Sequence, residues 1–320
     1  MTRLAIIQKA PVFLDKEETL AGAVVSVREA AAEGADLVIF TEAFIPGYPA
    51  WIWRLRPGGD WALSEEIHAL LLDNAVNLAG TDLMPLCEVA KQCHTTIVCG
   101  VNEIDHALSR ATLYNTVVVI GPDGKVINRH RKLMPTNPER MVWGFGDASG
   151  LNAVETEAGR IGTLICWENY MPLARYTLYS QGMEIYIAPT YDSGDDWLET
   201  LRHIAREGRC WVVGSGNILK ASDIPETFPQ KAGLYPDPDE WINSGDSVVI
   251  EPGGKVVAGP LQKEEGILFH DIDLKLARNA KRALDVAGHY ARPDIFRLHV
   301  NTESQSPIAC SQGNGNTGGE

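Results

Sequence analysis

Apolar runs of strand length alternate with amphipathic segments along most of the chain. Residues 4–8 form a short apolar run, and residues 35–41 (ADLVIFT) form another without polar alternation, which is typical of a strand buried on both faces. Between them, residues 16–33 carry apolar side chains at helical spacing, from Leu20 to Ala31. This alternation predicts an α/β fold.

The same periodicities predict further elements of both kinds. A helix at 172–181 begins with Pro172 and is followed by Gly182, and Gly208 is expected to end a helix at 196–207. The remaining predicted helices are 64–77, 83–93 and 274–284, and the remaining predicted strands are 95–101, 160–166, 185–188, 210–214 and 267–272.

Two β-hairpins interrupt the alternation of helices and strands. Residues 116–130 turn at Pro-Asp-Gly, and residues 247–257 turn at Pro-Gly-Gly. A purely parallel sheet has no place for hairpins, so we expect mixed sheets, one in each half of the chain. Residues 221–243 contain four prolines and are expected to form a long surface loop.

No linker divides the chain of 320 residues, so we expect residues 1–300 to form one domain. Residues 301–320 are rich in Ser, Gly, Asn and Thr, a composition typical of a disordered tail. The stretch 288–300 is too apolar for a free tail, because it contains aromatic residues such as Tyr290 and Phe296. We expect this stretch to be ordered in an assembly.

The charge balance is acidic and argues against two classes of partner. The 42 acidic residues outnumber the 28 basic ones, which gives a formal net charge of −14. Such a surface repels the phosphates of nucleic acids and anionic membranes, so neither is an expected partner. The apolar runs are far too short to span a bilayer, and the N-terminus lacks the pattern of a signal peptide. We therefore expect a cytoplasmic location.

The sequence contains no pattern typical of a metal or nucleotide site. Its six cysteines include no CxxC pair, and its eight histidines show no ligand spacing. A GxxxxGK[ST] loop is also missing. We expect no metal and no cofactor, and interpret most of the cysteines as small buried hydrophobic residues.

Glu42, Lys132 and Cys166 each stand at the end of a predicted strand. Ligand sites of α/β sheets gather at the carboxyl ends of strands, where loops converge. Each residue alone has an ordinary structural explanation: a capping carboxylate, a solvated lysine or a buried thiol. A carboxylate, an ammonium group and a thiol at three such ends form a set suited to covalent catalysis.

Three motifs give this set a closer interpretation. The segments FTEAFIPGYP, HRKLMPTNPERMVWGFGD and LICWENYMPLARY resemble the nitrilase family of the carbon–nitrogen hydrolase superfamily, and CWENYMPL resembles the true nitrilase branch. The family's glutamate, lysine and cysteine fall on Glu42, Lys132 and Cys166, and a further family glutamate falls on Glu139. The resemblance implies a four-layer α-β-β-α sandwich with two mixed sheets.

The chemistry expected of a nitrilase suits these residue types. A nitrile carbon is a weak electrophile, so a thiolate from Cys166 is an appropriate nucleophile. We assign Glu42 as the general base, which takes the thiol proton and later activates water, and Lys132 as the group that stabilises and protonates the nitrile nitrogen. The intermediates are a thioimidate and, after ammonia leaves, a thioester. Glu139 is expected to orient Lys132 and is a candidate for a share in proton transfer, although an ion pair with a neighbouring arginine, Arg131 or Arg140, is an open alternative. The backbone N–H of Trp167 is a candidate donor beside the thiol.

Aromatic residues near these motifs are candidates for a substrate pocket. The predicted substrate-binding residues are Tyr48, Trp143, Trp167, Thr190 and Tyr191. Trp51 and Trp53 fit the pocket and ordinary packing equally well. The sequence does not distinguish aliphatic, arylacetic and aromatic nitriles.

Three other functions remain open at this point: an amidase or carbamoylase acting on amide bonds, a cyanide hydratase or dihydratase, and a non-catalytic filament scaffold. The resemblance also implies a homodimer that grows into a larger homo-oligomer or spiral. We expect its dimer surface to contain the helices at 172–181 and 196–207. Residues 51–61 and 221–243 are candidates for a second contact.

Overall fold

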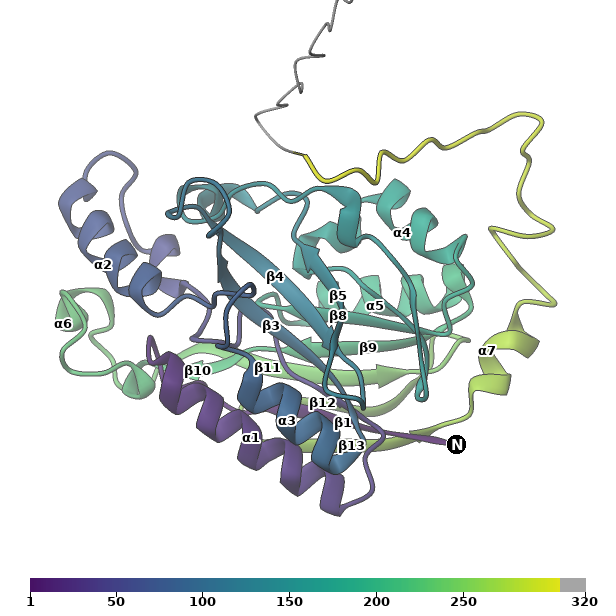
Figure 1. Ribbon diagram of the computed structural model, residues 1–320, viewed down its shortest axis with the longest axis horizontal. Helices are drawn as coiled ribbons and strands as arrows, with labels where there is room; N and C mark the ends of the chain where they lie inside the picture. The colour runs from purple at the N-terminus through teal and green to yellow at the C-terminus, as the bar shows by residue number, and fades with distance from the viewer. Residues whose placement is uncertain (306–320) are drawn as a thin grey trace, which may run out of the picture.

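The computed structural model describes residues 1–305 and contains two mixed β-sheets packed face to face (Figure 1). In the first sheet the order is β13-β1-β2-β3-β4-β5, formed by Gly266–Ile272, Thr2–Gln8, Leu37–Ile39, Thr96–Ile104, Leu113–Ile120 and Val126–Arg131. In the second the order is β10-β11-β9-β8-β7-β6, formed by Ile218–Lys220, Trp241–Ile250, Trp211–Gly216, Ile185–Thr190, Gly159–Thr163 and Val154–Thr156, and β12 (Val256–Gln262) pairs with β11.

Helices cover the outer face of each sheet. On the first sheet lie α1 (Lys16–Ala32) and α3 (Met84–Cys93), and on the second lie α4 (Pro172–Tyr179) and α5 (Asp195–Gly208) (Figure 1). The shorter helices and α2 lie at the margins: α2 is Trp61–Asp73, α6 is Lys231–Leu234 and α7 is Leu274–Ala280. The α/β class and the four layers expected from the sequence are therefore confirmed.

The alternation of side chains within the buried strands builds three apolar layers. On β1, Ala5 and Ile7 pack toward α1 and α3, whereas Leu4 and Ile6 pack toward the second sheet. All four side chains are fully buried. Because both faces of such a strand are covered, its sequence is continuously apolar, as in residues 35–41.

The two predicted hairpins form, as β4–β5 and β11–β12, and each makes its sheet mixed. The expectation of one sheet in each half of the chain is wrong in one respect. The C-terminal strand β13 crosses to the first sheet and pairs antiparallel with β1, with Thr2 opposite Ile272. This long-range pairing has no signal in local periodicity.

Several predicted boundaries also differ from the structure. The predicted strand 160–166 ends at Thr163, so Cys166 lies beyond the strand as the first residue of a 3-10 turn, Cys166–Tyr170. The helix α5 continues through Gly208 and ends where Arg209 adopts a left-handed conformation, with φ 47°. The predicted helices 64–77 and 274–284 are shifted or shortened to α2 and α7, and the short strands β6 and β10 were not predicted.

Residues 221–243 are not a simple surface loop. They include α6 and the first residues of β11, and three of their apolar side chains, Ile224, Phe228 and Tyr235, are buried. The Phe228 ring packs 5.9 Å from the ring of Trp51, measured between centroids. The two segments proposed as a second contact therefore pack against each other, and Trp51 is a core residue with 1% of its surface exposed.

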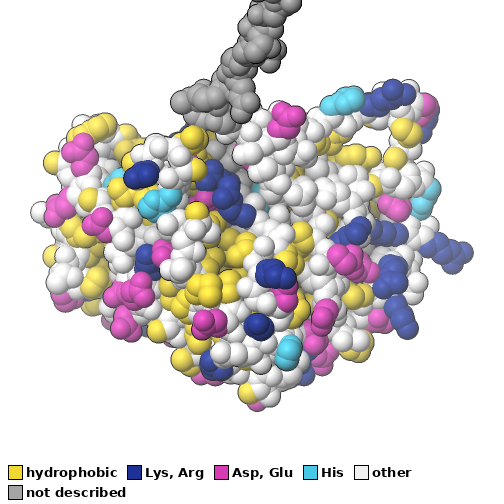
Figure 2. Space-filling view, viewed as in Figure 1, with side chains coloured by type: hydrophobic (Ala, Val, Ile, Leu, Met, Phe, Trp, Pro, Cys, Tyr) yellow, Lys and Arg dark blue, Asp and Glu magenta, His cyan; other side chains and the backbone are white. Residues whose placement is uncertain are grey.

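The chain beyond α7 contains no helix or strand within the described residues, and it runs along the outside of the molecule past α4 (Figure 1). Residues 306–320, which make up most of the predicted disordered tail, lie outside the described residues. No helix within 1–305 is both long and apolar enough to cross a membrane. Acidic and basic side chains are interspersed over the face shown in Figure 2.

Candidate active site

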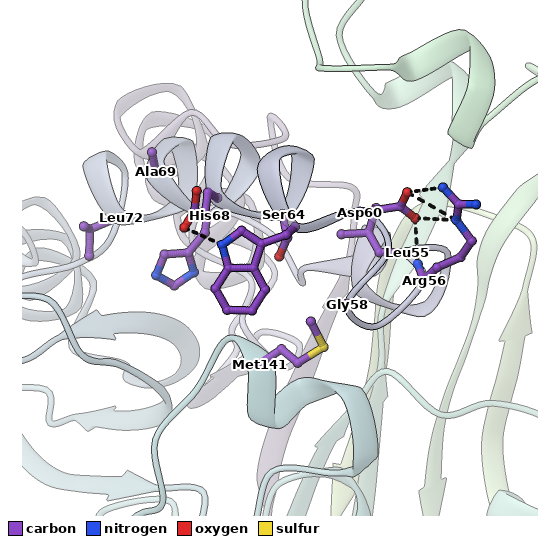
Figure 3. Close-up of a pocket in the computed structure, with 11 residues that line it drawn as sticks. Leu55, Arg56, Gly58, Asp60, Ser64, His68, Ala69, Leu72 and Met141 are labelled. Carbon is purple, nitrogen blue, oxygen red and sulfur yellow. Dashed lines mark hydrogen bonds and ion pairs between the residues drawn. The ribbon is translucent and has the colours of Figure 1, made fainter.

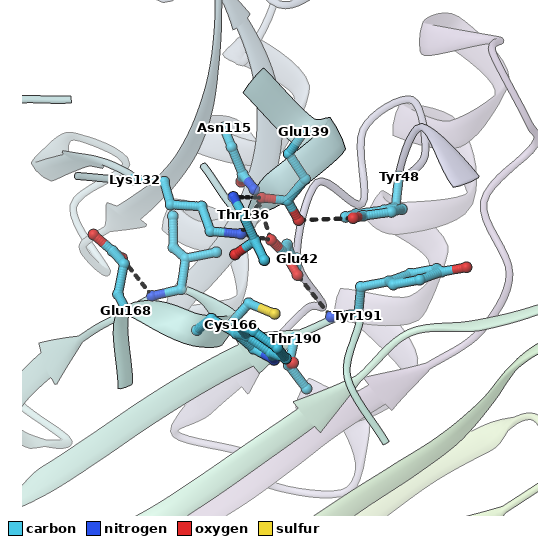
Figure 4. Close-up of polar contacts among 12 residues, drawn as sticks. Glu42, Tyr48, Asn115, Lys132, Thr136, Glu139, Cys166, Glu168, Thr190 and Tyr191 are labelled. Atoms are coloured by element: carbon cyan, nitrogen blue, oxygen red, sulfur yellow. Dashed lines mark hydrogen bonds and ion pairs between the residues drawn. The ribbon is translucent and has the colours of Figure 1, made fainter. Parts of the chain in front are cut away.

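Strand direction brings the three predicted catalytic residues to one end of the sandwich. In the first sheet β2 and β5 run the same way, because β3 is parallel to β2 and two antiparallel pairings separate β3 from β5. Glu42 follows β2 and Lys132 follows β5, so both lie at the same edge. Cys166 follows β7 of the second sheet, and its side chain faces this pair (Figure 4).

Lys132 is the centre of the polar contacts, and its side chain is completely buried. The Nζ atom lies 2.9 Å from Oε1 of Glu42 and 2.7 Å from Oε2 of Glu139. An ammonium group has three N–H donors, so one remains after these two contacts. The Nζ atom also lies 5.9 Å from the centre of the Trp143 ring, within the range of a cation–π contact.

The Glu42 carboxylate is held from three sides. Its Oε1 accepts a hydrogen bond from Asn115 Nδ2 at 2.7 Å in addition to the one from Lys132, and its Oε2 accepts one from the backbone N–H of Tyr191 at 2.6 Å. Gly100 on β3 makes room for this segment, because a Cβ atom there would lie 2.3 Å from the carbonyl oxygen of Thr41. The carboxylate therefore has a fixed orientation beside the thiol.

Glu139 is fixed by the turn that carries it, Asn137–Met141. Its Oε2 accepts from the backbone N–H of Thr136 at 2.7 Å, and its Oε1 accepts from the Tyr48 hydroxyl at 2.7 Å. The alternative pairing with an arginine is not found, because Arg131 binds Glu103 and Arg140 Nε donates to the carbonyl of Pro135. The structure thus brings Glu139 against Lys132, as predicted.

Cys166 occupies a backbone conformation that is uncommon for a residue with a side chain. Its φ is 50°, in the left-handed region, directly after β7. The side-chain amide of Asn169 donates to the carbonyl oxygens of Leu164 and Cys166, at 3.0 and 2.7 Å, and so holds the turn. This turn directs the thiol toward Glu42 and Lys132 instead of into the sheet (Figure 4).

Burial dominates the proton affinities at this site. Burial raises the pKa of the Cys166 thiol, and the Glu42 charge raises it further, against the opposing effects of Lys132 and the Thr190 side chain. Burial also raises the pKa of Glu42, which Lys132 only partly offsets. Burial lowers the pKa of Lys132, but the attraction of Glu42 and Cys166 outweighs it, so the net pKa is raised and the ammonium charge is kept. The resting pair is a neutral thiol beside a carboxylate with increased proton affinity.

A cavity of about 250 Å³ opens onto the thiol. Three of the five predicted substrate-binding residues line it: Tyr48, Trp167 and Tyr191. The other two do not line the cavity: Trp143 is buried, with its Nε1 donating to Asn102 Oδ1, and Thr190 lies beside Cys166 (Figure 4). The full lining is Tyr48, Trp53, Thr136, Glu139, Cys166, Trp167, Tyr191, Asp192, Ser193, Ile242 and Asn243.

Several residues that line the cavity were not predicted from the sequence, and Trp53 was left open. Asp192 and Ser193 directly follow the Tyr191 that was predicted, so extending that prediction along the loop would have found them. Ile242 and Asn243 reach the cavity from the far end of the segment read as a surface loop, and no local signal marks them. Trp53 lines the cavity, and its Nε1 donates to the Tyr48 hydroxyl at 3.0 Å, in contrast to the buried Trp51.

A larger cavity of about 390 Å³ lies elsewhere, between α2, the loop before it and Met141 (Figure 3). Its lining includes His68 and Trp61 but no cysteine or lysine, so it lacks the set of groups found beside Cys166. Within the described residues, no group of three or more His, Cys, Asp or Glu side chains is arranged to hold a metal ion.

This chain is similar in sequence and in fold to known carbon-nitrogen hydrolases. The carbon-nitrogen hydrolase family matches residues 3–282. An aliphatic nitrilase of Sinorhizobium fredii is 40% identical over 307 residues, covering 96% of this chain and 97% of that relative. A bifunctional nitrilase/nitrile hydratase of Nicotiana tabacum is 38% identical over 312 residues, covering 96% of this chain and 88% of that relative. A solved carbon-nitrogen hydrolase of Helicobacter pylori G27 shares the fold, with a TM-score of 0.69 at 18% identity over 92% of this chain and 96% of that one.

Proposed function

Because the chain belongs to the carbon–nitrogen hydrolase family, we propose that it hydrolyses an organic nitrile to the carboxylic acid and ammonia, with Cys166 as the nucleophile. One observation carries this proposal: an ammonium group with a free donor, Lys132, lies between two buried carboxylates at the cavity that holds a thiol. The relatives named as nitrilases favour a nitrile as the substrate.

The first half-reaction uses Glu42 and Lys132 together. Glu42 takes the proton of the Cys166 thiol as sulfur attacks the nitrile carbon, Lys132 gives a proton to the thioimidate nitrogen, and Glu42 returns its proton to Lys132 across the 2.9 Å contact. The developing negative charge on nitrogen is stabilised by the remaining N–H donor of Lys132. The raised pKa of Glu42 suits a base that must accept a proton from a thiol whose own pKa is raised.

The second half-reaction consumes two molecules of water. The first adds to the thioimidate carbon, the C–N bond breaks and ammonia leaves, so that a thioester to Cys166 remains. Glu42 then takes a proton from the second water, which attacks the thioester carbonyl and releases the carboxylic acid and the thiol. Glu139 keeps Lys132 in place throughout, through the 2.7 Å contact. These steps require no metal or cofactor.

The intermediate after the first water addition can break in two ways. Loss of ammonia gives the acid, whereas loss of the thiol gives the amide. The bifunctional relative of Nicotiana tabacum carries both activities in its name, so we propose that an amide by-product accompanies the acid here. An amidase or carbamoylase would use the same groups on an amide bond, and a cyanide hydratase or dihydratase would use them on cyanide.

A panel of substrates tests the proposal. Aliphatic, arylacetic and aromatic nitriles, their matching amides and cyanide are incubated with the wild-type protein and with Cys166→Ala, and ammonia, acid and amide are quantified. We expect acid and ammonia from at least one organic nitrile and none from the variant. Turnover of the amides or of cyanide with no turnover of any organic nitrile would refute the choice of substrate.

We also propose a homodimer that builds a larger homo-oligomer, with α4 and α5 on the dimer surface. Two observations support this proposal. Leu173 on α4 has 66% of its surface exposed, and residues 290–300 frame an open apolar groove along α4 without filling it. The cytoplasmic location expected from the sequence stays a prediction.

A further inference from the structure

Glu168 is a buried carboxylate that the reaction described above does not use. It lies two residues after Cys166, but its side chain points away from the cavity, on the side of Cys166 opposite Tyr48 and Tyr191 (Figure 4). Only 1% of the residue is exposed. A carboxylate at such a position needs several hydrogen bonds to offset its loss of hydration.

The hydrogen bonds of Glu168 join the two segments that carry the nucleophile and the lysine. Its Oε2 accepts from the backbone N–H of Ile165, next to Cys166, at 2.7 Å. Its Oε1 accepts from the backbone N–H of Leu133, next to Lys132, at 2.5 Å. One carboxylate group therefore bridges the first sheet and the second sheet immediately beside both functional side chains.

A third partner, His130, completes the arrangement. Its Nε2 lies 3.1 and 3.0 Å from the two carboxylate oxygens of Glu168. Its Nδ1 is buried and has no hydrogen-bond partner among the described residues, which assigns the ring hydrogen to Nε2. His130 lies on β5, two residues before Lys132, so it ties the same strand to Glu168 a second time.

We propose that Glu168, supported by His130, is a positioning residue that sets the placement of the Cys166 thiol relative to the Lys132 ammonium group. The inference rests on the proposed function, because it assumes that these two groups act together. Neither Glu168 nor His130 lines the substrate cavity. Their effect on the reaction is exerted through the backbone at Leu133 and Ile165, where a displacement of about 1 Å is enough to lower a rate about 10²-fold.

Three substitutions test this role. Glu168→Gln keeps the size of the side chain, but its amide nitrogen cannot accept a hydrogen bond, so one of the two backbone N–H groups loses its partner. His130→Leu removes the donor to Glu168, whereas His130→Gln keeps a donor near the position of Nε2. The matched control is Glu103→Gln, because Glu103 is also buried, with 2% exposed, and also binds β5 through Arg131.

The readouts are kcat and KM for a nitrile, the rate of Cys166 alkylation by iodoacetamide, and Tm. We expect Glu168→Gln to lower kcat by about 10- to 100-fold and to change KM by less than about threefold. Here kcat is calculated per active site, with the sites counted by titration. We expect His130→Leu to act in the same direction and His130→Gln to restore kcat to within about threefold of the wild type. Alkylation of Cys166 should slow by about tenfold in Glu168→Gln, because the thiol loses its alignment with Lys132.

The control separates positioning from general stability. If Glu168→Gln and Glu103→Gln lower Tm alike and both keep wild-type kcat and alkylation rates, Glu168 only stabilises the fold and the inference is wrong. If Glu168→Gln does not fold, the difference in kcat between His130→Leu and His130→Gln tests the positioning role instead. Failure of the proposed function has a different signature: the wild type would hydrolyse no nitrile, while the alkylation rates would still report the geometry around Cys166.

Discussion

Replacing Lys132 by Met removes the single cation that two buried carboxylates share. Methionine has a similar length and no charge, so the perturbation is chiefly electrostatic. Glu42 and Glu139 are each within hydrogen-bond distance of Nζ, at 2.9 and 2.7 Å, and all three side chains are at most 1% exposed. Among the described residues, neither carboxylate has another cationic partner, so the variant contains two uncompensated buried acids.

The size of the effect follows from this burial. Removing one partner of a buried ion pair destabilises a fold by about 3–5 kcal/mol, because the remaining charge stays desolvated. In the variant at least one carboxyl is expected to bind a proton, since burial already raises the pKa of Glu42 and Lys132 no longer opposes that rise.

The sign of the pH dependence follows from proton binding. A carboxyl whose pKa is higher in the folded than in the unfolded state stabilises the fold fully below its unfolded pKa. That stability is lost as pH rises toward the folded pKa, by about 1.4 kcal/mol per pH unit for each carboxyl. Lys132→Met should therefore lose stability as pH rises, more steeply than the wild type does.

Thermal unfolding between about pH 5 and about pH 8 measures this slope for the wild type, Lys132→Met and the control Lys16→Met. Lys16 forms a partly exposed pair with Asp82, at 2.9 Å, and neither residue lines the cavity, so its loss should lower Tm without steepening the slope in this way. Because Lys132 is assigned as the group that stabilises the nitrile nitrogen, Lys132→Met should also lower kcat by about 10²- to 10³-fold. A Tm profile of Lys132→Met parallel to that of the wild type would contradict the electrostatic reasoning, whatever happens to activity.

Three further predictions concern the nucleophile, the two carboxylates and the C-terminal segment. Cys166→Ala should abolish turnover without unfolding the protein, and mass spectrometry of the wild type with a slow nitrile should place the adduct on Cys166; an adduct on another cysteine would overturn the assignment. Glu42→Gln should lower kcat at least about 10²-fold, the lower range for loss of a general base, and Glu139→Gln should cost less if it only orients Lys132; the reverse order would exchange their roles. Deleting residues 301–320 should leave particle mass and activity nearly unchanged, whereas deleting the chain from residue 288 should lower both, because it removes the segment that frames the groove along α4. Light scattering decides the last point, and a monomeric wild type or equal masses for all three chains would disprove it.

Local patterning determined much of the architecture. The buried strands, the amphipathic helices α1 and α3 and both hairpins could be predicted because each depends on residues within one element. The positions of Glu42, Lys132 and Cys166 after apolar strands could also be recognised from the sequence. They indicated a site because strands that run in one direction have their carboxyl ends at the same edge of a sheet. These predictions did not require knowledge of which strands would become neighbours.

Only the tertiary structure decided which distant residues share the site. The Oε2 of Glu42 is held by the backbone N–H of Tyr191, 149 positions away, and Ile242 and Asn243 complete the cavity wall. Trp51 and Trp53 have the same local signal, but one packs in the core and the other lines the cavity. Periodicity reports whether a side chain is buried, and not what buries it, because the partner belongs to another part of the chain. The contacts of Glu168 with Leu133 and Ile165 across the two sheets depend on that same long-range packing.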